Sequence, residues 1–274
     1  MTFWQSVLAF LDTAMEKPLP YGTFHVLFFV LSFLALIPLL QHPKNPSGEH
    51  IRRVVWVTAL IVAVLEIYKQ INYSFSYKTG ITFDYQWYAF PFQFCSTPMY
   101  VGLLAGIIKK GKVHESLCAY LATYALFAGL SVMVYPTTVF ISTVGINVQT
   151  MICHGSMITI GIYLLATGYV PLKYKTVLKA LPVFAAAVLL AWGMNEIAYR
   201  SGLLETETFN MFFISPHCEP SLPVYSLVQA VVPFPLCLVF YILGFTAASW
   251  LVLVIGMGLA KLLQKRPVVS TLKS

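Results

Sequence analysis

The sequence predicts an all-α, polytopic membrane protein with seven transmembrane helices, and its composition and apolar stretches support this. Of its 274 residues, 58% are hydrophobic and only 10% are charged, whereas soluble domains average about 25% charged residues. The mean hydropathy is +0.77. Too little charge remains to cover a water-facing globule, which excludes a cytosolic enzyme, a disordered chain and a nucleic-acid binder.

Seven apolar stretches are long enough to cross a hydrocarbon core about 30 Å thick, which takes roughly 20 residues of helix. We predict spans near residues 24–40, 54–73, 92–108, 116–134, 148–167, 177–199 and 235–262. The last stretch is the longest and is expected to tilt or to extend along the interface. No linker, low-complexity segment or internal repeat divides the chain, so residues 1–274 are expected to form one domain.

Two segments outside the spans have a predicted place. Within residues 1–20, apolar side chains recur at helical spacing, which fits either a short helix lying in the membrane interface or a plain helical lead-in. These side chains are Phe3, Trp4, Val7, Leu8 and Leu11. The loop at 200–227 is the longest, and we expect it to face outward as a cap.

The orientation follows from the lysines and arginines in alternate loops. Thirteen of the 17 basic residues fall in one set of loops. They are Lys44, Arg52, Arg53, Lys109, Lys110, Lys112, Lys173, Lys175, Lys179, Lys261, Lys265, Arg266 and Lys273. The opposite set holds Lys17, Lys69, Lys78 and Arg200. The N-terminus is therefore expected outside and the C-terminus in the cytoplasm, and the basic loops need only contact anionic lipid.

Polar residues inside the spans mark a candidate site, because such residues are costly in a bilayer and usually face the bundle interior. At about 1.5 Å per residue, Glu66, Cys95 and His154 all lie roughly 5–10 Å below the outer surface. Four spans thus converge on one outward-facing pocket. Its other candidate residues are Lys69 and Gln70 on the face of Glu66, Gln93, Ser96 and Thr97 beside Cys95, and Asn147, Gln149 and Asn195.

Each of these residues also has a structural interpretation. Glu66 and Lys69 can form a neutralising pair that lets the helix pack. His154 can serve only as an interhelical hydrogen-bond donor, and Asn195 as polar glue between helices.

The chemistry open to this pocket is narrow. Glycine-rich nucleotide loops, a carboxylate pair and a common metal-ligand spacing are all absent from the sequence, so no cofactor, metal or nucleotide is expected. A nucleophile and a base remain: Cys95, expected in the first turn of the span at 92–108, and His154. A helix N-terminus favours the thiolate, and an imidazole can accept its proton and later protonate a leaving group.

Several motifs together carry a resemblance to a known family. They are FPFQFCS at 90–96, YPTTVF at 135–140, GINVQTM at 145–151, HGSM at 154–157, and the polar positions 66–70 and 195–196. Over nearly the whole chain they resemble the YwaF-type membrane proteins of bacteria. That group is related to transmembrane protein 164 of animals, an integral membrane acyltransferase that moves fatty acyl chains between phospholipids, and more distantly to membrane hydrolases of fatty acid esters.

The resemblance implies an acyltransferase or acyl hydrolase of the bacterial plasma membrane that acts on phospholipid or related lipid esters. Cys95 would attack the ester and His154 would move the proton, while Asn147, Gln149 and Asn195 would hold head groups or the oxyanion. The bacterial motif usually has histidine two residues before the cysteine, where this chain has Gln93. Should Cys95 not be the nucleophile, Ser96 or Thr97 is the next candidate.

Two other functions stay open at this point. One is a transporter or flippase component for lipids or small molecules, and the other is a non-catalytic seven-helix binding protein. In each case membrane lipids are the expected partners, and neither nucleic acid nor nucleotide is. The sequence also leaves open the acyl donor and acceptor, the oligomeric state, and whether Cys218 and Cys237 form a disulfide.

Overall fold

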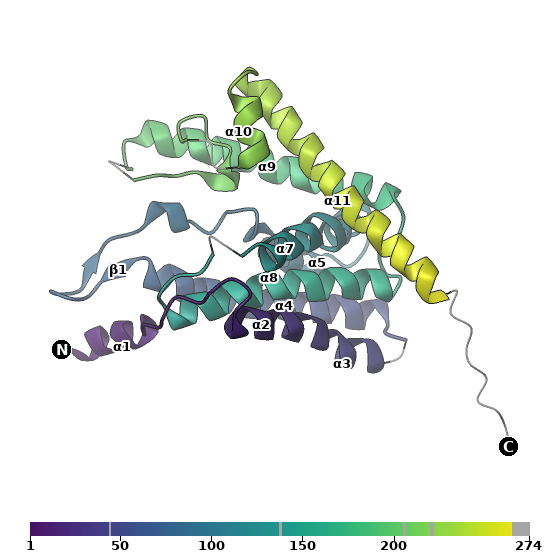
Figure 1. Cartoon of the computed structure of the whole chain (residues 1–274), viewed down its shortest axis with the longest axis horizontal. Helices are drawn as coiled ribbons and strands as arrows, with labels where there is room; N and C mark the ends of the chain where they lie inside the picture. Colours follow the sequence, from purple (N-terminus) through teal and green to yellow (C-terminus); the bar gives the residue numbers. More distant parts are fainter. Residues whose placement is uncertain (44, 137–138, 205–206, 220–221, 265–274) are drawn as a thin grey trace.

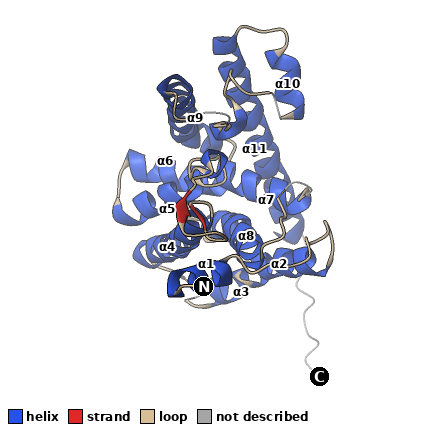
Figure 2. Cartoon of the chain, turned by 90° about the vertical axis from the view of Figure 1, so that its left-hand side faces the viewer, coloured by secondary structure: helices blue, strands red, loops and turns tan. Residues whose placement is uncertain are grey.

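A computed structural model of the chain shows a bundle of long apolar helices (Figures 1 and 2). It describes residues 1–43, 45–136, 139–204, 207–219 and 222–264. In those residues six helices are long and apolar enough to cross a membrane, which confirms an all-α, polytopic membrane protein. Lys44, Thr137, Thr138, Lys265, Arg266 and Lys273 lie outside the described residues.

The six long helices coincide with six of the predicted spans. The first is made of α2 (Thr23–Leu34) and α3 (Leu36–Gln41), and the third joins α6 (Lys112–Tyr120), the π-helical η2 (Leu121–Ala125) and α7 (Leu126–Val134). The others are α4 (Gly48–Asn72), α8 (Val144–Ala166), α9 (Lys175–Ser201) and α11 (Phe234–Gln264). The short elements are α1 (Phe3–Leu11), β1 (Phe75–Ser76), β2 (Thr82–Phe83), η1 (Trp87–Ala89), η3 (Met211–Phe213) and α10 (Pro223–Gln229).

The predicted span at 92–108 differs from the others, because its helix α5 covers only Thr97–Ile107. Eleven residues of helix reach about 16 Å, roughly half of a hydrocarbon core. Pro98 explains where α5 begins: a proline fits the first turn of a helix, but its ring would clash with the carbonyl of Phe94 if the helix extended further back. The sequence predicts that Cys95 lies in the first turn of this helix. In the structure Cys95 instead lies in the turn that precedes α5.

The two ends of the bundle are distinct. Figure 1 places the N-terminus and β1 at one end of the long helices and the C-terminal end of α11 at the other. A chain that begins at one end and reaches the other at the close of α11 fits an odd number of passages, so a count of seven depends on the short helix α5 serving as one of them. The N-terminal α1 is amphipathic and exposed, with Phe3 and Trp4 72% and 65% accessible.

Glycines allow α7 and α8 to pack backbone against backbone, as small residues do in membrane proteins. A Cβ atom on Gly129 of α7 would lie 2.7 Å from the carbonyl oxygen of His154 and 2.8 Å from Met157 Cβ. On the other helix, a Cβ atom on Gly161 would lie 2.7 Å from Leu126 Cβ. Because His154 sits on the helix that Gly129 touches, this contact also fixes the depth of the candidate site.

We expect Gly129→Ala to destabilise the protein by about 1–3 kcal/mol, because the new methyl group overlaps backbone that cannot move aside. Thermal unfolding of purified protein in detergent measures this as a lower midpoint. Gly193→Ala in α9 is the matched control, since a Cβ atom there meets nothing within 4 Å. Equal midpoints for the two variants would contradict the close packing of α7 on α8.

Candidate active site

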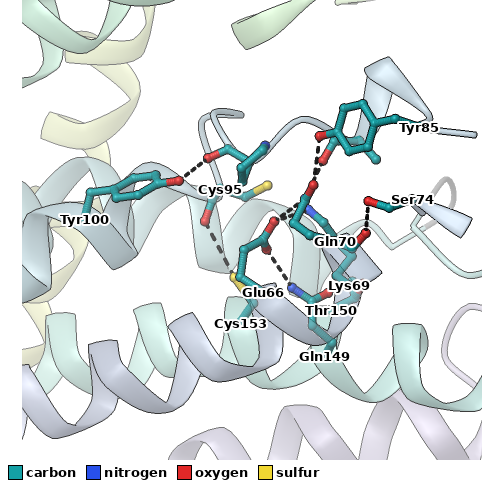
Figure 3. A network of polar contacts seen from close by, with 12 residues as sticks. Glu66, Lys69, Gln70, Ser74, Tyr85, Cys95, Tyr100, Gln149, Thr150 and Cys153 are labelled. Atoms are coloured by element: carbon teal, nitrogen blue, oxygen red, sulfur yellow. Dashed lines mark hydrogen bonds and ion pairs between the residues drawn. The ribbon is translucent and has the colours of Figure 1, made fainter. Parts of the chain in front are cut away.

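The buried carboxylate of Glu66 is the centre of a polar network in the helix bundle (Figure 3). Lys69 Nζ lies 2.7 Å from Glu66 Oε1, and Gln70 Nε2 donates to the same oxygen at 2.8 Å. Gln149 Nε2 of α8 donates to Glu66 Oε2 at 3.2 Å. Both carboxylate oxygens thus have partners, as a buried charge requires. The sequence placed Lys69 and Gln70 on the face of Glu66, and the structure confirms this.

Tyr85, in the loop between β2 and η1, extends this network beyond α4. Its hydroxyl donates to Gln70 Oε1 at 2.8 Å, and Gln70 Nε2 also donates to the carbonyl oxygen of Ala89 at 2.9 Å. Burial and the negative charge of Glu66 raise the pKa of Tyr85 to about 12, so the hydroxyl stays protonated and remains a donor. Sequence reasoning missed Tyr85, because a tyrosine in an irregular loop carries no periodic signal.

Cys95 lies beside this network, on the turn that leads into α5. In Figure 3 its thiol is on the side where Glu66 and Gln70 meet. Cys95 is partly exposed, whereas Ser96 and Thr97 are buried at 5% and 3% accessibility. The Thr97 hydroxyl already donates to the carbonyl oxygen of Phe94 at 2.8 Å and lies 2.7 Å from the Tyr120 hydroxyl. Of the three candidate nucleophiles, Cys95 is therefore the most accessible.

Side chains from two other elements satisfy the backbone of this turn. Non-helical backbone at membrane depth is tolerated only where protein groups or a water-filled cavity pair with it. The hydroxyl of Tyr100 donates to the carbonyl oxygen of Pro91 at 2.8 Å, and Cys153 Sγ on α8 donates to the carbonyl oxygen of Cys95 at 3.6 Å. These contacts hold the backbone of Cys95 in place beside the polar network.

A narrow cavity of about 30 Å³ begins at Cys95 and runs between α4, α5, η2 and α8. This is room for about one water molecule. Its lining is mostly apolar, with Val55, Val62, Met99 and Ile160 among the residues, and Cys153 lies on its wall. A lipid acyl chain can enter only if these helices move apart.

His154 is buried one position after Cys153 on α8. Its Nδ1 lies 2.7 Å from the carbonyl oxygen of Thr150. Because a carbonyl can only accept, Nδ1 carries the proton, and Nε2 is the basic nitrogen of the neutral ring. Among the described residues, no hydrogen bond joins His154 to Cys95, and the cavity wall includes Cys153 and not His154.

Two of the other predicted pocket residues bind the backbone of the buried segment around η3, between α9 and α10. Gln93 Nε2 donates to the carbonyl oxygen of Asn210 at 3.0 Å, and its Oε1 accepts from the backbone N–H of Phe212 at 3.0 Å. Asn195 makes the same pair of bonds to the backbone of Met211, at 3.1 and 2.8 Å. Phe212 has a left-handed φ of 58°, which is strained for a bulky residue and needs such support. The side-chain amides of Gln93 and Asn195 are therefore used in hydrogen bonds to the backbone of residues 210–212.

Asn147 has a similar role in a different loop. Its side chain accepts from the N–H of Ile141 at 3.0 Å, donates to the carbonyl oxygen of Ile141 at 2.7 Å and also contacts Met15 Sδ at 3.2 Å. The structure therefore gathers Glu66, Lys69, Gln70 and Gln149 around Cys95, while Gln93, Asn147 and Asn195 bind backbone. All five cysteines are free, so Cys218 and Cys237 are not joined by a disulfide.

Comparison with known proteins gives one match. The model of the TMEM164 family matches residues 20–254. No curated protein and no solved structure matches the chain. The matched region contains Glu66, Cys95 and His154.

We expect Glu66→Gln to destabilise the protein by about 3 kcal/mol, because it leaves the Lys69 ammonium without its partner at a site that is only 16% exposed. Unfolding in detergent measures the loss. The double variant Glu66→Gln/Lys69→Met should recover most of it, since no unpaired charge is left. If the two substitutions lower stability additively, Glu66 and Lys69 are not an obligatory pair.

Proposed function

The chain belongs to the TMEM164 family, and from this premise we propose that it is a membrane-embedded acyltransferase or acyl hydrolase. Its substrates are phospholipids or related lipid esters. One observation carries the proposal: Cys95, a partly exposed residue, lies where a half-length helix begins, between a buried polar network and an apolar cavity. An ester has the same two halves, because a polar carbonyl is attached to an apolar chain.

In the proposed reaction the Cys95 sulfur attacks the ester carbonyl and forms a thioester. The bond from the acyl carbon to the ester oxygen breaks, and the lysolipid leaves as an alcohol. His154 Nε2 takes the thiol proton and delivers it to that departing oxygen. An acceptor hydroxyl or water then attacks the thioester, loses its proton to His154, and releases Cys95.

The proposal includes a movement that brings the pair together. His154 bonds within its own helix and does not contact Cys95, and the cavity holds about one water molecule. Entry of an acyl chain must widen the gap between α5 and α8. We propose that this opening aligns His154 with Cys95, as catalytic hydrogen bonds often form only in the substrate complex. Glu66, Lys69, Gln70 and Gln149 position the turn and the ester.

A transporter or flippase component is the second candidate, and the short helix α5 is the observation that favours it. Discontinuous helices with irregular backbone at membrane depth are typical of transporter binding sites. Here the irregular segment ends at Ser96, and α5 runs from Thr97 to Ile107. A transporter would move lipid without changing its acyl composition, which separates the two functions by experiment.

The assay uses purified protein in proteoliposomes with a phospholipid and a lysophospholipid, without partner or energy source, and follows acyl composition by mass spectrometry. We expect Cys95→Ala and His154→Ala each to abolish acyl exchange or release at normal membrane levels. The double variant should be no worse than either single one, because the two residues act as a unit. Cys237→Ala is the control, since this buried thiol on α11 donates to the carbonyl oxygen of Val232 at 3.2 Å and does not line the cavity at Cys95.

Full activity in Cys95→Ala would reject the thiol and direct attention to Ser96. Wild-type protein that moves lipid and leaves acyl composition unchanged would favour the transporter.

We further propose that the protein is in a bacterial plasma membrane with its N-terminus outside, so that the Cys95 site opens to the outer leaflet. A membrane-impermeant thiol reagent should then label cysteines introduced at Lys78 or Glu207 in intact cells, and not at Lys110 or Lys175. Lysed cells, in which all four positions should react, provide the control. The reverse pattern in intact cells would invert the orientation and place the site at the inner leaflet.

A further inference from the structure

A second cavity lies at the other end of α5 from Cys95. It has a volume of about 460 Å³ and is formed by the loop after α5, the start of α6, the loop after α8 and the start of α9. This end of the bundle carries the basic loops. The positive-inside rule explains why lysines occur there, but it does not require them to line a cavity.

The charge in this cavity is strongly positive. Lys109, Lys110 and Lys179 line it, and Glu115 is its one acidic residue among those described. Glu115 is already paired, because its Oε2 lies 2.6 Å from Lys179 Nζ. The ammonium groups of Lys109 and Lys110 are exposed and have no ion pair among the described residues.

Two helices also begin at the cavity. Gly111 immediately precedes α6, and Thr176 is the second residue of α9; both line the cavity. Neither helix has a side chain that caps its start. In α9, however, the N–H of Thr176 already donates to the carbonyl oxygen of Lys173 at 2.9 Å, and its hydroxyl donates to that of Pro171 at 2.6 Å, which leaves the start of α6 as the candidate. Gly111 has a left-handed φ of 98°, a conformation that glycine adopts without strain. Uncapped helix starts present backbone N–H groups and a positive dipole end, which together favour a bound anion.

A buried histidine supplies an independent observation. His114 lines the cavity and is only 5% exposed. Its Nε2 lies 2.7 Å from the Tyr169 hydroxyl and 3.5 Å from Cys118 Sγ, and the ring also interacts with the backbone of Ile108 and Ala105 at the end of α5. By hydrogen-bond geometry its buried Nδ1 has no partner among the described residues. When Nε2 accepts from Tyr169, Nδ1 carries a proton that makes no hydrogen bond of good geometry among the described residues. Buried donors without an acceptor are rare, and an anion in the cavity would provide one.

We propose that this cavity is a binding site for a phosphate group. A phosphate offers three or more oxygens to the two free ammonium groups, to the start of α6 and to His114 at once, whereas a carboxylate has only two oxygens and a smaller charge. The cavity opens at the membrane interface, where phospholipid head groups carry this group. Basic pockets between membrane helices bind such head groups. The site is separate from Cys95, and its occupancy does not depend on acyl transfer.

The test is calorimetric titration of the detergent-solubilised full chain with two probes, short-chain phosphatidic acid and inorganic phosphate. We expect phosphatidic acid to bind, and the variant Lys109→Gln/Lys110→Gln to bind at least about tenfold more weakly, because it loses two charge-assisted contacts. His114→Phe should weaken binding as well. The matched control is Lys173→Gln/Lys175→Gln, which removes equal charge at the same end of the bundle from exposed lysines outside the cavity.

The outcomes separate the sources of the phosphate. Competition between the two probes shows that the phosphate group itself is recognised, and tighter binding of phosphatidic acid identifies a lipid. Binding of inorganic phosphate alone supports the site and makes its ligand a soluble phosphate. Equal weakening by the two lysine pairs, or no binding of either probe, overturns the proposal and leaves the lysines with a topological role.

Discussion

The pairing of one buried carboxylate determines how the parts of the candidate site fit together. Glu66 lies on a helix whose surroundings exclude water, so its charge needs partners from the protein. Those partners come from α4 itself, through Lys69 and Gln70, and from α8, through Gln149. Gln70 then reaches the loop at Ala89 and Tyr85. One charge thus links two helices and the loop that leads to Cys95.

The second constraint is the backbone before α5. Because α5 begins only at Thr97, several residues before it lack regular helical hydrogen bonds, and such backbone needs partners from the protein wherever hydrocarbon surrounds it. Tyr100 and Cys153 supply partners for the carbonyl oxygens of this turn. The cost of irregular backbone is therefore offset by contacts from α5 and α8. The turn that contains Cys95 can therefore present backbone polar groups as well as side chains, whereas a continuous helix would present only side chains.

The positions of the long helices could be predicted from the sequence, because a stretch of about twenty mostly apolar residues allows few other structures. The sequence also located Glu66, Lys69 and Gln70, whose helical spacing places them on one face. It could not locate Tyr85 or Tyr100, which come from an irregular loop and from the side of a helix. Hydropathy indicates that a side-chain amide is buried, but it does not indicate which groups that amide hydrogen-bonds. For this reason Gln93 and Asn195 look like pocket residues in the sequence, while in the structure they hold the backbone of residues 210–212.

A thiol suits this position for a physical reason that the neighbouring hydroxyls make clear. A buried hydroxyl costs free energy unless it is hydrogen-bonded, and Thr97 accordingly lies between Phe94 and Tyr120. A nucleophile with such bonds would have to break them before it could react. A thiol is a weak donor that behaves as a small hydrophobe when it is not ionised, so Cys95 can rest against an apolar cavity at little cost. Two residues of the same turn therefore have different roles: Thr97 fixes the turn by hydrogen bonding, and Cys95 is left partly exposed.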